Sequence, residues 1–102
     1  MSNESLTPTE GARFLLEREQ DDGVRARYRA AIYTPAATYE GQATMCDDGS
    51  VEIEAPGAPD ELFSTLQMLA KLTARSAAKK REDGLPPWPA RVLRWRGPGR
   101  GE

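Results

Sequence analysis

Three groups of residues in this 102-residue chain are of types that can do chemistry. Two acidic pairs, Asp21-Asp22 and Asp47-Asp48, each precede a glycine, and carboxylates of this kind can hold a divalent cation. The single cysteine, Cys46, can act as a nucleophile or redox thiol beside a cation. Both tryptophans and several arginines gather between Trp88 and Arg96. Arginine can contact phosphates and tryptophan can stack on bases, so this segment could bind nucleic acid.

The acidic pairs fit turn chemistry better than metal binding. Asp-Asp-Gly between segments that alternate apolar and polar residues is typical of a three-residue hairpin loop, in which the glycine is left-handed. The alternating Asp ligands of a calcium loop are missing, and basic residues expected nearby would oppose a cation. Cys46 has no partner cysteine in the chain and no visible general base. We therefore expect no metal site and no cofactor.

The absence of histidine removes whole classes of catalysis. Ser-His-Asp and Cys-His mechanisms and His-ligated zinc all require it, and one cysteine excludes thiolate metal sites. Neither a GxxxxGK[ST] nor a GxGxxG phosphate loop occurs in the sequence. We therefore expect a protein that is not an enzyme and has no catalytic residues.

Length and composition indicate one small globular domain, since 38% of residues are hydrophobic and 29% are charged. The net charge of -2 argues against broad binding of nucleic acid by the whole domain. The first twenty residues carry no secretory signal, and no apolar run is long enough to span a membrane. With a lone cysteine, these features favour a cytoplasmic protein without a membrane partner. Richness in Ala, Arg, Gly and Pro suggests a bacterial source.

The first Asp-Asp-Gly run predicts a hairpin whose loop is flanked by Gln20 and Val24. One face of this hairpin is then apolar, and the other carries opposite-charge pairs. The predicted cross-strand pairs are Ala12–Ile32, Phe14–Ala30, Leu16–Tyr28, Glu17–Arg27 and Glu19–Arg25. A slip of one residue would mix the two faces, so the pattern selects this register. The alternative is a helix from Pro8 to Glu19, because Thr7-Pro8-Thr9-Glu10 has the form of a capping box.

Two more hairpins follow. Tyr33 is expected to pair with Thr38, and Cys46 with Ser50 across the second Asp-Asp-Gly loop. The three registers agree with one another, which predicts a four-stranded antiparallel meander in the order 1-2-3-4. Strands 1 and 4 are then the edges of the sheet, and acidic residues on strand 4 discourage uncontrolled pairing.

A long helix is expected from Pro59 to Glu82, where the apolar period changes from two to that of a helix. Gly84 ends it and the following prolines prevent its return. The helix packs on one face of the sheet over Tyr28 and Ala43, and its basic end reaches the Asp-Asp-Gly loops. The expected fold is therefore α+β. Its parts are a flexible N-terminus over 1–10, a single domain over 11–84 and a Pro/Trp/Arg-rich extension over 85–102 with a disordered end.

The open face of this sheet and the extension hold the candidate binding residues. On the second strand, three arginines form a cationic stripe between carboxylates. In the extension the tryptophans either pack on the core or bind a partner. Trp88, Val92 and Trp95 fit one helical stripe, whereas Arg91, Leu93 and Trp95 fit one strand face. The candidate residues are Arg25, Arg27, Arg29, Tyr33, Trp88, Arg91, Arg94, Trp95 and Arg96. We expect a non-enzymatic module that binds another protein, or a second copy of itself. The alternative, nucleic-acid binding, uses the same arginines and tryptophans.

Overall fold

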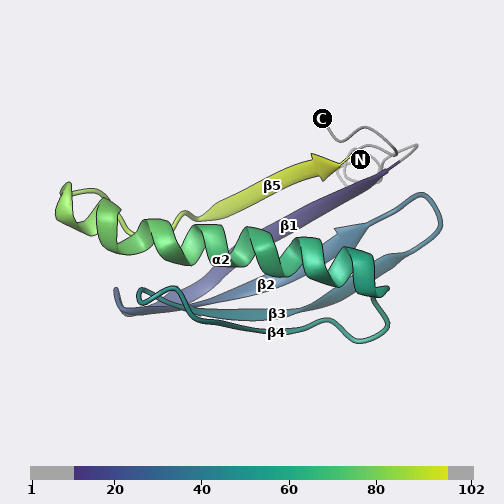
Figure 1. Ribbon diagram of the computed structural model, residues 1–102, viewed down its shortest axis with the longest axis horizontal. Helices are drawn as coiled ribbons and strands as arrows, with labels where there is room; N and C mark the ends of the chain where they lie inside the picture. Colours follow the sequence, from purple (N-terminus) through teal and green to yellow (C-terminus); the bar gives the residue numbers. More distant parts are fainter. Residues whose placement is uncertain (1–10, 97–102) are drawn as a thin grey trace.

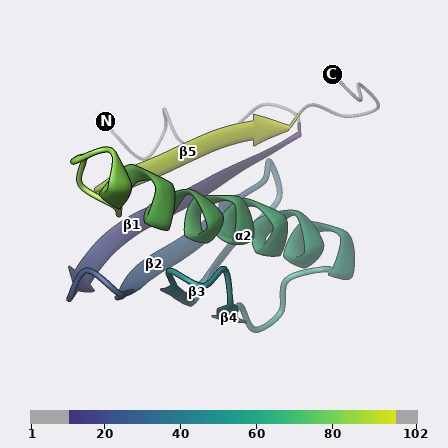
Figure 2. The same ribbon diagram turned by 60° about the vertical axis from the view of Figure 1, so that its left-hand side comes forward.

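The computed structural model describes residues 11–96, in which an antiparallel sheet of five strands is covered on one face by one long helix (Figures 1 and 2). The elements are β1 (Ala12–Asp21), β2 (Arg25–Tyr33), β3 (Thr38–Cys46), β4 (Val51–Glu54), α2 (Asp60–Glu82) and β5 (Arg91–Arg96). In space the strands follow the order β4-β3-β2-β1-β5. The α+β class is confirmed. The segment expected to be flexible, the capping box and the expected disordered end lie outside the described residues.

The second and third hairpins have the predicted registers, since Tyr33 pairs with Thr38 and Met45 with Val51. Both Asp-Asp-Gly loops close with a left-handed glycine, at φ 93° in Gly23 and φ 95° in the second loop. A glycine takes this conformation without the steric cost of a side chain, which is why it ends such loops.

The aspartates of the first loop hold the turn. The Asp22 carboxylate accepts hydrogen bonds from the backbone N–H groups of Val24, at 3.0 Å, and Arg25, at 2.8 Å. Both hydrogen bonds lower the pKa of Asp22, and the one from Arg25 has the larger effect. In the second loop the hydroxyl and N–H of Ser50 donate to Asp48 and lower its pKa in the same way. Both carboxylates therefore cap turns, as expected from the aspartate preference of such loops.

The predicted register of the first hairpin is wrong by two residues. Phe14 pairs with Ile32, and Glu17 pairs with Arg29. Because Asp22 builds a longer turn, the strands first meet at Asp21 and Ala26, and a bulge between Arg18 and Gln20 then shifts the register once more. A net shift of two keeps every side chain on its expected face, since side chains alternate along a strand.

The predicted four-stranded meander is incomplete, because the C-terminal extension adds β5 alongside β1. Leu93 lies opposite Leu15, so β1 is an interior strand and not an edge. Leu15 and Ala31 point away from the helix, toward the face expected to be open, yet both are buried. The run Phe14-Leu15-Leu16 is apolar on both faces, which is typical of a fully buried strand.

Helix α2 ends as predicted, with Gly84 at φ 78°. The N–H of Leu85 donates to the carbonyl of Lys80 at 2.8 Å, and the N–H of Gly84 to that of Arg81 at 3.1 Å, which is a Schellman motif. The expected approach of the basic end to the loops is confirmed, because Arg81 lies 2.8 Å from the Asp47 carboxylate. Within residues 11–96 no helix has the length and apolar character needed to cross a bilayer.

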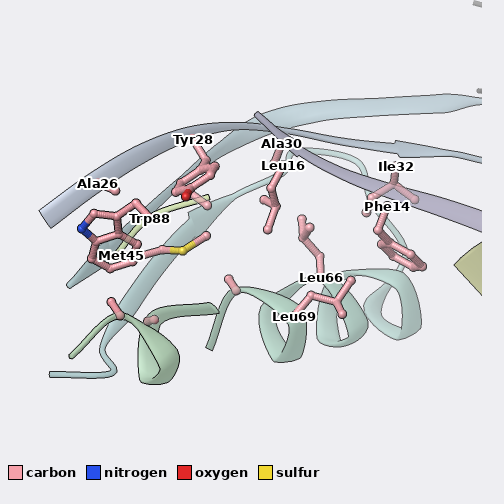
Figure 3. Close-up of a cluster of buried hydrophobic side chains, with 14 of the residues drawn as sticks. Phe14, Leu16, Ala26, Tyr28, Ala30, Ile32, Met45, Leu66, Leu69 and Trp88 are labelled. Atoms are coloured by element: carbon pink, nitrogen blue, oxygen red, sulfur yellow. The ribbon is translucent and has the colours of Figure 1, made fainter. Parts of the chain in front are cut away.

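The core lies between the sheet and α2, and Trp88 closes it at the end near the loops (Figure 3). Its side chain is 1% exposed and its indole N–H donates to the Gly23 carbonyl at 3.1 Å. The Tyr28 hydroxyl donates to the Pro89 carbonyl at 2.6 Å, and Arg18 donates to the Trp88 carbonyl at 2.7 Å. Three side chains thus fasten the start of the extension to the sheet.

Tyr28 makes stability depend on pH in the alkaline range. Burial raises the pKa of Tyr28 from 10.0 to about 12. Between these values the unfolded chain loses the phenol proton while the folded chain keeps it, so the free energy of unfolding falls by about 1.4 kcal/mol per pH unit. Below pH 10 this contribution is fully present.

Urea unfolding of the wild type and Tyr28→Phe at increasing pH tests this. Near neutral pH we expect the wild type to be more stable by about 1 kcal/mol, because the variant lacks the hydrogen bond to Pro89. Above pH 10 this difference should shrink and reverse, because phenylalanine does not titrate. A difference that stays constant up to pH 12 would contradict the assignment.

Candidate functional site

The three candidate arginines of β2 lie on the open face of the sheet, the face turned away from α2, and carboxylates neutralise two of them. Arg29 donates a hydrogen bond of 2.5 Å to Glu17, and this bond raises the pKa of Arg29. Arg27 lies 3.5 Å from Glu19. These pairs replace the predicted Glu17–Arg27 and Glu19–Arg25 pairs because of the shifted register. The stripe is thus a surface of ion pairs and not an uncompensated cationic strip.

The third arginine, Arg25, lies opposite Cys46, as predicted. A hydrogen bond with Cys46 is the main cause that raises the pKa of Arg25. The thiol is half-buried and borders a shallow hollow of about 350 Å³ that also touches Thr44 and Glu52. Within residues 11–96, no three His, Cys, Asp or Glu side chains are grouped so that they could hold a metal ion.

The last four candidate residues, Arg91, Arg94, Trp95 and Arg96, come together on β5. We call the outer side of Arg91–Arg96, with its backbone and side chains, the β5 edge. Side chains at 91, 93 and 95 point to the open face, and those at 92, 94 and 96 to the helix side. Figure 1 shows β5 as the outermost strand beside β1. All three charged side chains of the strand are exposed arginines, Arg91, Arg94 and Arg96.

The backbone of the β5 edge can accept another strand. The Ala90 carbonyl accepts a hydrogen bond of 2.9 Å from Arg18 on β1. Hydrogen-bonded and non-hydrogen-bonded pairs alternate along an antiparallel ladder, so the polar backbone groups of Val92 and Arg94 point to β1. Those of Arg91 and Leu93 point outward. In the described part of the chain, no strand pairs with this outer side.

The two faces of the β5 edge differ in chemistry. On the open face Leu93 is 36% exposed and Trp95 is 47% exposed. On the helix side a shallow hollow of about 240 Å³ separates β5 from α2. It is lined by Leu72, Thr73, Ser76, Lys80, Pro89, Arg91, Val92 and Arg94. One face is thus partly apolar and the other is cationic.

The remaining candidates lie away from this edge. Tyr33 is two strands further in, in one row with Arg13 and Trp95 across the sheet. Trp88 is buried in the core. Sequence reasoning did not include Leu93 or the outward backbone of β5. A partial signal was present, because Arg91, Leu93 and Trp95 fit one strand face, but the alternative helical stripe left the conformation of this segment open.

Comparison with models of known protein families, with curated proteins and with solved structures gives no match to this chain.

Proposed function

We propose that this protein is a non-enzymatic module that binds another protein by pairing an extended, acidic segment of its partner with the β5 edge. The observation that carries the proposal is an outer strand whose three charged side chains are all exposed arginines. Addition of a strand to a sheet edge draws affinity from main-chain hydrogen bonds and specificity from alternate side chains. The outward backbone N–H and C=O groups of Arg91 and Leu93 can form the main-chain hydrogen bonds. The side chains of β5, which point alternately to its two faces, supply the specificity.

The two faces of β5 define the partner's sequence pattern. On the helix side Arg94 and Arg96, with Lys80 across the hollow, favour Asp or Glu in the partner. On the open face Leu93 and Trp95 favour apolar side chains. A bound strand also alternates, so its sequence should alternate acidic and apolar residues.

Nucleic acid is the competing class of partner, since the same arginines could contact phosphates and Trp95 could stack on a base. Two observations support protein instead. Two of the β2 arginines that would extend a phosphate track across the sheet, Arg27 and Arg29, are paired with Glu19 and Glu17. The outward polar backbone of β5 matches a peptide strand rather than a sugar-phosphate chain.

The test is fluorescence anisotropy of three labelled probes with the full chain. They are a peptide of alternating Glu and Val, its Lys-Val counterpart and a single-stranded oligonucleotide. We expect the Glu-Val peptide alone to bind. Arg94→Glu should weaken its affinity roughly tenfold, which corresponds to about 1.4 kcal/mol. Lys71→Glu reverses the same charge on the outward side of α2 and should change the affinity little.

Two results would overturn the proposal. Equal affinity of the Glu-Val peptide for the wild type and Arg94→Glu would place binding elsewhere. Tight binding of the oligonucleotide, lost steeply as salt is raised, together with no peptide binding, would assign the edge to nucleic acid.

A further inference from the structure

The side of α2 that points away from the sheet carries two large apolar residues in its middle. Met68 is 42% exposed and Leu72 is 51% exposed, one helical turn apart. A shallow hollow of about 250 Å³ lies beside them, bordered also by Ser64, Lys71 and Arg75. The sheet packs on the opposite side of the helix (Figure 2), and Leu72 also borders the hollow between α2 and β5.

Three pairs of residues on this outward side are placed symmetrically about Ala70. At equal distances before and after it stand Met68 and Leu72, then Ser64 and Ser76, then Glu61 and Lys79. Ala70 itself is fully buried against the sheet. At 3.6 residues per turn, the six mirrored positions all fall on the side opposite Ala70. Thr65 and Arg75 also mirror each other on this side, but their residue types differ. The stripe therefore has an apolar centre, polar flanks that include one arginine, and ends of opposite charge.

We propose that this stripe is the contact between two copies of the chain, with the two α2 helices packed antiparallel across a two-fold axis that passes beside Ala70. A two-fold contact requires a surface that is complementary to itself. In this arrangement Met68 of each copy meets Leu72 of the other. Glu61 of each copy meets Lys79 of the other. The inference does not depend on the function proposed for the β5 edge.

Charge determines the orientation of the two helices. A parallel pair would place Glu61 beside Glu61 and Lys79 beside Lys79, and like charges in contact are destabilising. The antiparallel pair turns both contacts into ion pairs. The serines at positions 64 and 76 are small, and each Arg75 side chain must extend past the contact into water, for the helix axes to approach to the usual 8–10 Å.

The contact is weak for three reasons. One helix pair buries less than the roughly 1,200–2,000 Å² of a stable interface. Lys79 already lies 3.9 Å from Asp83 of the same chain, in an exposed ion pair, and it must give up this pair to contact Glu61 of the other copy. The two Lys71 side chains lie near the axis and must extend into water to avoid each other. We therefore expect a dissociation constant on the order of 10–100 µM.

Sedimentation velocity of the full chain over a range of concentrations tests the proposal. We expect the wild type to pass from monomer to dimer, and Leu72→Glu to weaken the dimer at least tenfold. Glu61→Lys and Lys79→Glu should each weaken it, and the double variant should restore it. Asp60→Lys, which reverses a charge in the same helical turn off the stripe, should have little effect. Circular dichroism confirms that each variant folds.

Cysteine cross-linking tests the orientation. In a Cys46→Ser background, a mixture of Ser64→Cys and Ser76→Cys chains should form mixed disulfide dimers when oxidised with a copper–phenanthroline catalyst. Each chain alone should form few. Strong cross-linking of Ser64→Cys with itself would overturn the antiparallel arrangement. A chain that stays monomeric at millimolar concentration, or a dimer unchanged by Leu72→Glu, would overturn the proposal as a whole.

Discussion

Replacing Trp88 with alanine should lower the free energy of unfolding by about 3–5 kcal/mol, the usual cost of removing a large aromatic residue from a core. Trp88 is the largest fully buried side chain of the described residues, and it lies beside Met45 and Tyr28 (Figure 3). Its removal opens a cavity at the end of the core and also breaks the bond to Gly23. Small domains have a total stability of about 5–15 kcal/mol, so this loss leaves a marginal fold. Urea unfolding followed by circular dichroism measures it without relying on tryptophan fluorescence.

Trp95→Ala is the matched control, since it removes the same side chain from a half-exposed position on the same segment. We expect a change within about 1 kcal/mol. Equal losses in the two variants would show that Trp88 does not have the core position described. A chain that ends at Gly84 lacks both Trp88 and β5 and should be unfolded. If it folds as well as the full chain, the extension adds nothing to the core.

Local signals were sufficient where a turn alone determines the pairing. The second and third hairpins follow from turn residues and alternation, and their registers are as predicted. The first hairpin differs because Asp22 accepts hydrogen bonds from both Val24 and Arg25, and these bonds lengthen the turn. A bulge beyond Arg18 then restores the alternation. The faces of the sheet were therefore predicted correctly, although the ion pairs on them were not.

Strand β5 could not be derived from its own residues. Trp88, Val92 and Trp95 fit one helical stripe, whereas Arg91, Leu93 and Trp95 fit one strand face, and the segment becomes a strand by pairing with β1, far away in the sequence. The run Phe14-Leu15-Leu16, apolar on both faces, is typical of a buried strand but does not show which segment pairs with it. The clustering of Arg91, Arg94 and Arg96 on one edge follows from this long-range pairing. For this reason the arrangement of these arginines on one edge could not be predicted from the segment alone.

Gly41, near the other edge of the sheet, is a second position whose neighbours could not be predicted from the sequence. By its size alone, a glycine on the apolar face would be expected to leave room for the helix to approach closely. The close neighbour is instead the backbone at the end of β4. A Cβ at position 41 would lie 1.8 Å from the carbonyl oxygen of Glu54 and 2.9 Å from the Cα of Ala55. No other side chain can therefore stand here unless β4 moves.

Gly41→Ala should consequently lower the free energy of unfolding by about 3 kcal/mol, at the upper end of the usual cost of overpacking. The added methyl group meets backbone atoms that cannot rotate away, so β4 must shift and its pairing with β3 must weaken. Gly49→Ala is the control: its added methyl group has room, with Arg75 at 3.6 Å, and only its φ of 95° is strained. We expect that variant to lose about 1–2 kcal/mol. Urea unfolding of both variants separates steric contact with β4 from backbone strain at a positive φ. A smaller loss of stability for Gly41→Ala than for Gly49→Ala would mean that β4 is not in close contact with position 41.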